Sequence, residues 1–482
     1  MIGKIFFPIA SENLKALMFK KIFPLFLVIA FLLTSGFGCK LVGSETENAM
    51  KPISLKYWRV FDGEDAFDEI IRNYRALHPY VNIEYRKLRY AEYEKELLEA
   101  MAEDKGPDIF SIGNSWVGKY ESKIEPLPEK ITMVYPVEKG TLKKEVVPEL
   151  RTTKTITLKE LKDQFVDVVV DDVVISVKNE ETGKLKEAIM GIPLSADALA
   201  VYYNRDLLNN SGIAVPPAYW NKDFQEAIKK LTKQDINGQV IQSGIALGGG
   251  KNIERSGDIL AALMLQNGAE LMSEGRVAFD RIPAAFAGER YNPGIEALRF
   301  YTDFSNPAKE VYTWNKDLTG SLNMFLSGRL AMMIGYAYHL PTIKSQAPKL
   351  KVGIAKLPQI EGSGQTVNFA NYWVEVVSKK SQYKDEAWDF IQFAAKPENA
   401  KSYLLKTGKP PALRSLIDEM KEEEEMGIFT EEILTAKSWY HGKDPLAADE
   451  IMAALIDDTA AGADKIENLI SQAATKVQQT IE

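Results

Sequence analysis

A chain of 482 residues is longer than one ordinary hydrophobic core accommodates, so the sequence predicts at least two lobes. Hydrophobic and charged contents of 45% and 26% are typical of a globular protein, and a net charge of −8 argues against a nucleic-acid partner, which needs clustered Lys and Arg. A single Cys excludes an internal disulfide, and three widely separated His argue against a zinc enzyme, so we expect no cofactor.

Residues 1–38 have the pattern of a signal peptide, because a pair of lysines precedes a short apolar run that ends in small residues. Met18 stands directly before this pattern and is a better start than the first methionine. Cys39 follows and predicts a bacterial lipid-attachment site, although Gly36 stands where such sites usually carry Leu or Val. A plain cleaved signal or an uncleaved anchor is the alternative interpretation. The polar residues 39–51 are then expected to form a flexible tether, which places the protein at the cell surface or in the periplasm.

The chain that follows alternates between strand and helix patterns. We expect strands at 53–57, 81–85 and 108–112, separated by helices at 67–77 and 93–101. This alternation predicts a doubly wound α/β lobe with a largely parallel sheet.

In such a lobe, ligands bind beyond the carboxyl ends of the strands. The loops after the first and third predicted strands therefore hold the first candidate binding residues. These are Trp58, Arg59 and Asp62 in one loop and Asn114, Ser115 and Trp116 in the other. An indole beside such polar groups suits a sugar, whose CH face stacks while its hydroxyls form hydrogen bonds. Packing of both indoles within their own loops is the alternative interpretation.

The stretch from Gly191 to Leu208 predicts a crossing between two lobes. Its first apolar run stops at Pro193, which has no N–H for a strand ladder. The small residues Ser195 and Ala196 allow a bend, and Asp197 at the bend is a further candidate because its side chain is expected to face the gap. A short extended crossing can act as a hinge, since a few residues absorb the φ and ψ changes of a domain motion.

Four segments together resemble the extracellular solute-binding proteins of ABC importers, the branch that includes maltose-binding protein. They are Gly106 to Ile109 with Trp116 to Tyr120, the crossing 191–208, Met324 to His339, and 367–378 as a second crossing. The resemblance implies an α/β type II periplasmic-binding-protein fold, in which crossover strands join two doubly wound lobes. It divides the chain into lobe 1, residues 52–196 and 372–420, and lobe 2, residues 197–371 and 421–482.

The resemblance adds candidate binding residues from the second half of the chain. Family loops place an aromatic side chain into the cleft, and by position Tyr338 matches best and Tyr336 next, with Trp314 shortly before the same segment. Tyr372 and Trp373 lie in the second crossing. Because side chains alternate along a strand, at most one of these two is expected to face the cleft.

The resemblance implies a monomeric receptor that captures a small ligand between its lobes and delivers it to an ABC permease. Aromatic residues on predicted loops favour a sugar or oligosaccharide as that ligand. An extracellular carbohydrate-active enzyme is the alternative; it would need two facing carboxylates, for which Asp62 and Asp197 are the loop candidates. A surface adhesin would show β-sandwich patterning, which this sequence lacks.

Overall fold

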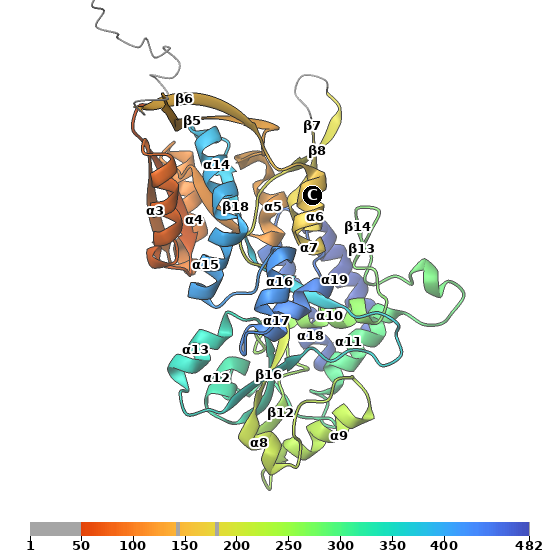
Figure 1. Cartoon of the computed structure of the whole chain (residues 1–482). Helices are drawn as coiled ribbons and strands as arrows, with labels where there is room; N and C mark the ends of the chain where they lie inside the picture. The colour runs from red at the N-terminus through yellow and green to blue at the C-terminus, as the bar shows by residue number, and fades with distance from the viewer. Residues whose placement is uncertain (1–49, 141–144, 179–182, 482) are drawn as a thin grey trace, which may run out of the picture.

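The computed structural model describes residues 50–140, 145–178 and 183–481, which form two α/β lobes, one above the other in Figure 1. The predicted signal peptide, the start at Met18 and the lipid-attachment residue Cys39 lie outside the described residues. Within these ranges, none of the helices has the length and apolar character that crossing a bilayer requires.

Lobe 1 is built on a five-stranded sheet of order β2-β1-β3-β18-β4. The strands are β1 (Ile53–Val60), β2 (Val81–Leu88), β3 (Ile109–Gly113), β4 (Ile124–Glu125) and β18 (Trp373–Ser378). β1 runs parallel to β2 and β3, and the helices α3 (Asp68–Leu77) and α4 (Tyr90–Ala102) connect them, which confirms the predicted doubly wound start. β18 returns from lobe 2 and pairs antiparallel with β3. The other helices of this lobe are α5 (Val117–Tyr120), α6 (Leu158–Gln164), α7 (Asp167–Val173), α14 (Lys384–Ala394), α15 (Pro397–Thr407) and α16 (Arg414–Met420).

Lobe 2 has a second five-stranded sheet, of order β11-β12-β15-β10-β16. Its strands are β10 (Ala200–Asn204), β11 (Lys233–Gln234), β12 (Val240–Ile245), β15 (Leu330–Gly335) and β16 (Val352–Lys356). Every residue of β15 is buried, as its unbroken apolar run requires. The helices are α8 (Arg205–Asn210), α9 (Lys222–Leu231), α10 (Ser256–Gln266), α11 (Pro293–Asp303), α12 (Ser321–Leu326), α13 (His339–Gln346), α17 (Gly427–Glu432), α18 (Pro445–Ala460) and α19 (Ile466–Ile481). A short hairpin, β13 (Met272–Ser273) with β14 (Arg276–Val277), projects beside α10.

Three short strands cross between the lobes and pair with one another. They are β9 (Asp197–Ala198), β17 (Asn368–Asn371) and β19 (Ala436–Lys437), in the order β19-β17-β9. The hydrophobic cores change over along these strands: Ala198 packs in the first core and Leu199 in the second, while Phe369 packs in the second and Ala370 in the first. We call this three-stranded sheet the hinge sheet.

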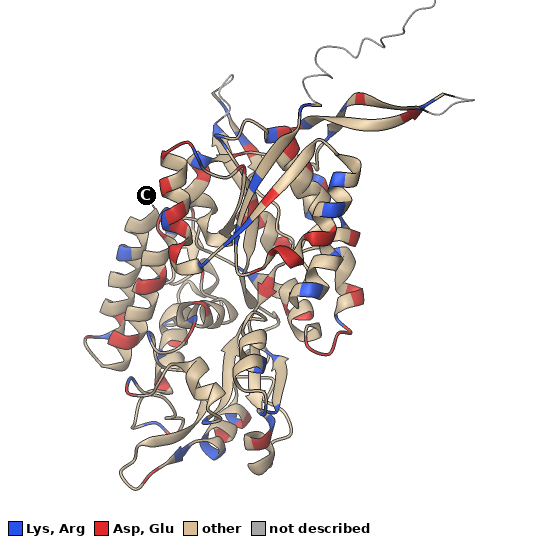
Figure 2. Cartoon of the chain, turned by 90° about the vertical axis from the view of Figure 1, so that its left-hand side faces the viewer, with Lys and Arg blue, Asp and Glu red and all other residues tan. Residues whose placement is uncertain are grey.

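Two hairpins lie on lobe 1 between β4 and β9. The first is a long ribbon of β5 (Lys130–Lys139) and β6 (Glu145–Lys154), which extends beyond the body of the lobe, and the second is formed by β7 (Val174–Lys178) and β8 (Leu185–Ile189). Charges of both signs lie along the first ribbon in Figure 2. Pro136 and Pro148 face each other within it, and because neither has an N–H, they limit pairing of the ribbon with another strand.

Candidate functional site

An aromatic wall, formed by Phe61, Tyr90 and Trp373, lies at the carboxyl-end edge of the lobe 1 sheet. Phe61 stacks on Tyr90 with ring centres 5.7 Å apart and meets Trp373 edge to face at 5.6 Å. Phe61 and Tyr90 remain 52% and 49% exposed, although large aromatic rings are usually buried. Phe61 also has a positive φ of 65°, a strained conformation for a bulky residue and one that tends to occur at functional sites.

Lobe 2 presents a charged group to this wall. Arg255 precedes α10 and donates from Nε and Nη2 to the two carboxylate oxygens of Asp258, at 2.8 Å each. Its Nη1 reaches Asp449 on α18 at 3.3 Å. Burial by the surrounding protein raises the pKa of Asp449 to about 6, although its side chain is 53% exposed. Burial raises the pKa of Tyr90, and the charges of Arg255 and Asp449 also act on it, so these lobe 2 groups lie within electrostatic range of the aromatic wall.

A narrow cavity of about 30 Å³, enough for about one water molecule, lies where the two lobes meet the hinge sheet. Its lining combines lobe 1, lobe 2 and hinge residues, including Asn114, Ser115, Arg255, Asn371 and Asp449. We call the space bounded by the aromatic wall, this charged group and the hinge sheet the cleft.

Asp197 on β9 connects the hinge sheet to the aromatic loop of lobe 2. Burial raises the pKa of its carboxyl to about 7, while the backbone amides of Ala337, Ala198 and Tyr338 oppose that rise. On the same loop, Tyr338 is 45% exposed and stacks on His339 with ring centres 4.3 Å apart. Asp197 therefore positions an exposed aromatic ring beside the hinge.

Arg59 and Asp62 belong to a buried ion network and not to the cleft surface. Arg59 is 3% exposed and lies 3.1 Å from Glu375 and 3.3 Å from Asp62. Lys409 donates to both oxygens of Asp62 at 2.7 Å. Burial alone would raise the pKa of Asp62, but Arg59 and Lys409 hold it below its ordinary value. This network fixes the loop after β1, from which Phe61 projects.

Several other predicted contacts also pack inside the lobes, which corrects the expectation that they face a ligand. Trp314 is fully buried in lobe 2, where its Nε1 donates to Asn252 at 2.9 Å. Tyr336 and Tyr372 donate their hydroxyls at 2.6 Å to the buried carboxylates of Asp258 and Asp172.

In lobe 1, the side chains of Trp58, Trp116 and Asn114 are also buried against other residues. Trp58 is 8% exposed and lies beneath the guanidinium of Arg86 at 4.6 Å. Trp116 is 6% exposed and packs behind Trp373 with ring centres 5.9 Å apart. Asn114 lines the cavity, but its amide is already used in a 2.9 Å bond to Asp172. Of the twelve predicted ligand contacts, Trp373, Tyr338 and Ser115 retain partly exposed side chains beside the cleft.

The sequence analysis missed Phe61, Tyr90, Arg255 and Asp449. Tyr90 begins α4, two residues after the last residue of β2, so the strand-end rule applied to that strand as well would have found it. Arg255 and Asp449 carry no comparable signal, because they are 194 residues apart and only the packing of α10 against α18 brings them together.

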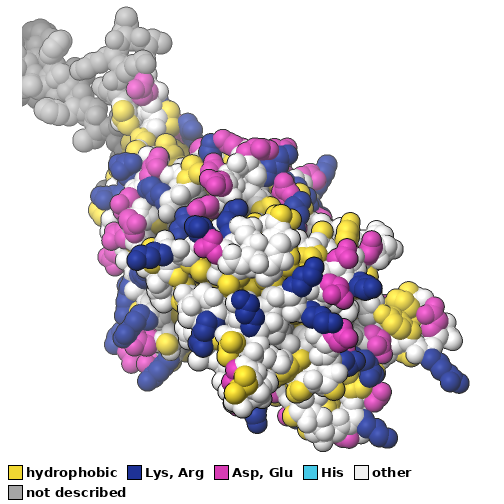
Figure 3. Space-filling view, turned by 90° about the horizontal axis from the view of Figure 1, so that it is seen from below, with side chains coloured by type: hydrophobic (Ala, Val, Ile, Leu, Met, Phe, Trp, Pro, Cys, Tyr) yellow, Lys and Arg dark blue, Asp and Glu magenta, His cyan; other side chains and the backbone are white. Residues whose placement is uncertain are grey.

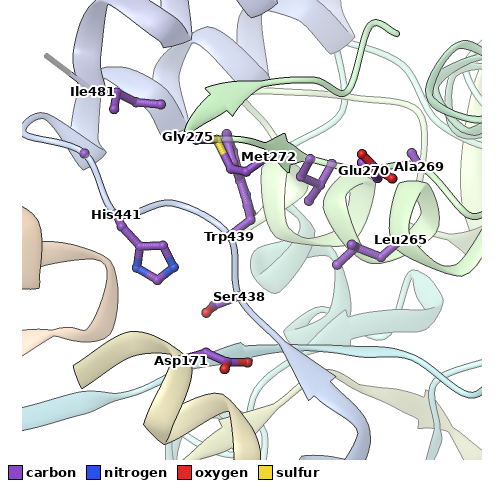
Figure 4. Close-up of a pocket in the computed structure, with 12 residues that line it drawn as sticks. Asp171, Leu265, Ala269, Glu270, Met272, Gly275, Ser438, Trp439, His441 and Ile481 are labelled. Carbon is purple, nitrogen blue, oxygen red and sulfur yellow. The ribbon is translucent and has the colours of Figure 1, made fainter. Parts of the chain in front are cut away.

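A wider hollow of about 650 Å³ lies beside the third crossing and shares Ser438 and Trp439 with the narrow cavity (Figure 4). It is lined by Asp171, Met272, Trp439, His441 and the carboxyl end of α10. Its part beside Leu265 lies about 16 Å along α10 from Arg255, whereas Trp439 lines both this hollow and the narrow cavity. In the described part of the chain, no group of three or more His, Cys, Asp or Glu is arranged to hold a metal ion.

Comparison with known proteins settles the family. Residues 62–401 match the model of the bacterial extracellular solute-binding protein family, which is more than half of the chain. The chain belongs to this family. It is thus a solute-binding protein of an ABC transporter, and the family is non-enzymatic, which decides against the carbohydrate-active enzyme considered above.

Individual relatives are distant. The chain is 23% identical to the sn-glycerol-3-phosphate-binding periplasmic protein of Shigella flexneri over 389 residues, which cover 78% of each chain. Its fold is similar to that of a cyclo/maltodextrin-binding protein complexed with maltotetraose, with a TM-score of 0.66 and 16% identity over 90% of this chain and 98% of that one. The sugar-binding protein MalE of Xanthomonas citri gives the same TM-score and identity over 89% and 97% of the two chains. The type II periplasmic-binding-protein fold is confirmed.

Proposed function

We propose that this solute-binding protein captures a sugar or oligosaccharide between its lobes and hands it to a membrane permease. The observation that supports this ligand class is the placement of the exposed aromatic wall opposite the polar group of lobe 2. Stacking on Phe61, Tyr90 or Trp373 would bury the apolar face of a sugar ring, while Arg255 and Asp449 would bind its hydroxyls.

Ligand capture would work by closing the lobes about the hinge sheet. A ligand shifts the population toward the closed form only if it gains contacts there that the open form lacks. The aromatic wall and the Arg255 group belong to different lobes, so a ligand that bridges them gains contacts on closure. Binding in the micromolar range corresponds to about −8 kcal/mol, which must include the free energy of closure.

We further propose that Cys39 carries a lipid, which would anchor the receptor to the membrane at the cell surface or in the periplasm, and that the receptor is a monomer. The support for this is the sequence: an apolar run followed by small residues and the chain's only cysteine, then a polar tether. A tethered receptor remains close to its permease, which raises its effective concentration there.

Tryptophan-fluorescence titration of the purified protein with a panel of sugars tests the ligand class. We expect saturable binding of at least one sugar, with the sugar recovered unchanged. Trp373→Ala is expected to weaken that binding about tenfold or more, because it removes a ring of the wall. Trp220→Ala is the matched control, since Trp220 is also half-buried among aromatic rings but packs on Phe224 and Phe300 within lobe 2. Equal weakening by both variants, or conversion of the sugar to a product, would contradict the proposal.

A further inference from the structure

One buried carboxylate of lobe 1 has no part in the cleft surface described above. Asp172 lies on α7 and is 1% exposed. Its Oδ2 accepts hydrogen bonds from Nδ2 of Asn114 at 2.9 Å and from the hydroxyl of Tyr372 at 2.6 Å. Its Oδ1 accepts a hydrogen bond from the hydroxyl of Ser438. Both oxygens are therefore occupied, by donors from three segments that are far apart in the sequence.

The three donors lie where the cleft and two of the crossings meet lobe 1. Asn114 directly follows β3 and lines the narrow cavity. Tyr372 lies between β17 and β18, and its carbonyl accepts the backbone N–H of Asn114 at 2.9 Å. Ser438 directly follows β19 and lines the same cavity. The Asp172 carboxylate thus connects a cleft loop with the second and third crossings.

The positions of these bonds limit where the two crossings can bend. In the second crossing, Ala370 and Tyr372 already pack in the first core, so the hydroxyl bond holds a residue that moves with lobe 1. In the third crossing, Ala436 packs in the first core and Tyr440 in the second. The bond from Ser438 extends the attachment to lobe 1 beyond Ala436. Bending of the third crossing is therefore left to the residues between Ser438 and Tyr440.

The segment after β19 also stays in contact with lobe 1. Nζ of Lys443 donates to the backbone carbonyl of Gly118 at 2.9 Å and lies 3.1 Å from Glu121. The backbones of Gly118 and His441 touch, since a Cβ at position 118 would lie 2.1 Å from the carbonyl oxygen of His441. Nδ1 of His441 lies 3.9 Å from the Asp172 carboxylate. The segment therefore follows the surface of α5 and α7, with His441 bordering the hollow in Figure 4.

Burial distinguishes Asp172 from the charges on the surface. Basic and acidic side chains are interspersed on the lower face of lobe 2 (Figure 3), and solvent screening leaves charges of that kind little effect on the fold. Solvent does not reach Asp172, so water does not compete for its three hydrogen bonds. Burial raises the pKa of Asp172, and the charge of His441 and the three hydrogen bonds act against that rise.

We propose that Asp172 is a positioning residue, which fixes the angle between the two lobes by holding the second and third crossings through Tyr372 and Ser438. Without these bonds the crossings would bend closer to lobe 1, and the lobes would sample additional arrangements. A receptor that spends less time in its binding-competent arrangement binds more weakly by the same factor. The proposal rests on the lobe closure proposed above and identifies a residue that restricts it.

Distances between spin labels on the two lobes test this proposal without a ligand. The labels are attached to the cysteines of Lys95→Cys on α4 and Ser345→Cys on α13, which replace exposed residues of lobe 1 and lobe 2. The full chain also carries Cys39→Ser, so that no other cysteine is labelled. Pulsed electron–electron resonance gives the distribution of distances between the lobes, and circular dichroism checks that each variant is folded.

Four variants are compared with this labelled reference. Tyr372→Phe and Ser438→Ala each remove one donor, and we expect the ratio of other lobe arrangements to the main one to rise about tenfold in at least one of them, because a buried hydrogen bond to a carboxylate is lost. Asp172→Asn retains the size of the side chain but turns an NH₂ group toward a donor, and is expected to broaden the distribution at least as much. Asp171→Asn removes a charge from the preceding, exposed residue of α7, which borders the hollow, and is expected to leave the distribution unchanged.

Unchanged distributions in both Tyr372→Phe and Ser438→Ala would overturn the proposal, even if their stability falls, because Asp172 would then only support the fold. Equal broadening in Asp171→Asn would overturn it as well. The sugar-receptor function would survive either result, since the sugar titration tests it separately. Conversely, failure of every sugar to bind would leave the distance measurements valid.

Discussion

Glu432 provides a test of how the hinge region limits stability. Its carboxylate is 5% exposed and accepts a hydrogen bond from Nδ2 of Asn368 in β17. The same amide group of Asn368 donates to the backbone carbonyl of Leu199 at 2.8 Å, just after the first crossing. Glu432 therefore contacts the point where two crossings meet, and burial raises its pKa from 4.5 to about 7.

The change in pKa sets the expected size and direction of the effect. Because the folded protein holds the proton more tightly than the unfolded chain, wild-type stability falls as the pH rises from about 4.5 to about 7. Above pH 7 the accumulated cost is about 3 kcal/mol. Glu432→Gln keeps an acceptor for Asn368 and cannot ionise, so it lacks this cost.

Urea denaturation followed by tryptophan fluorescence, at pH 5 and pH 8 and constant ionic strength, measures the difference. We expect the stability advantage of Glu432→Gln over wild type to grow by about 2 kcal/mol between the two pH values. Glu422→Gln neutralises an exposed glutamate and is expected to differ from wild type by no more than about 0.5 kcal/mol. Parallel pH profiles for wild type and Glu432→Gln would refute the reasoning.

Two further predictions concern lobe 1 and the N-terminal segment. Arg59→Met is expected to destabilise the protein by about 3–5 kcal/mol in urea denaturation, because it leaves Glu375 and part of the Asp62 charge uncompensated in the core; a loss under 1 kcal/mol would contradict this. Cys39→Ser is expected to move the protein from the membrane to the soluble fraction of fractionated cells, and unchanged membrane association would reject the lipid proposal.

The sequence predicted the fold because fold depends on patterns that repeat. Strand–helix alternation fixes a parallel start to lobe 1, and Pro193 with the small residues after it marks a crossing, whatever the surrounding packing is. The third crossing, β19, was not predicted as a strand, because it has only two residues and one of them is a lysine. Two residues are too few to show a period.

The predicted site residues come from loops that the structure brings to the same edge of the lobe 1 sheet and to the hinge sheet, but most of their side chains lie inside the lobes. Trp58 lies within β1, beneath Arg86, whereas Phe61 directly follows that strand with a positive φ and an exposed ring. No pattern in the sequence shows which of these two aromatic side chains is buried and which is exposed. Arg59 looked like a ligand contact for a related reason: a charged residue at a strand end has the same appearance whether it binds a ligand or completes a buried network.

Tyr372 lies between β17 and β18, and Trp373 is the first residue of β18. Their side chains nevertheless point in different directions, as the prediction that at most one faces the cleft requires. Tyr372 turns inward, where its hydroxyl meets Asp172, and Trp373 turns toward Phe61. The sequence could not show which of the two would face the cleft, because that choice depends on the register of β18 against β3, where Trp373 pairs with Gly113, 260 positions away.

Three carboxylates whose charged form is disfavoured by burial lie in the same region as the aromatic wall. Asp197 lies in the first crossing, Glu432 precedes the third, and Asp449 borders the cleft, and burial raises the pKa of each. A carboxyl group held where its charged form is disfavoured lowers the stability of the fold at neutral pH. Proteins tolerate such local conflicts at sites where function requires them, so the position of these three acids around one hinge supports its role as the moving and binding part of the molecule.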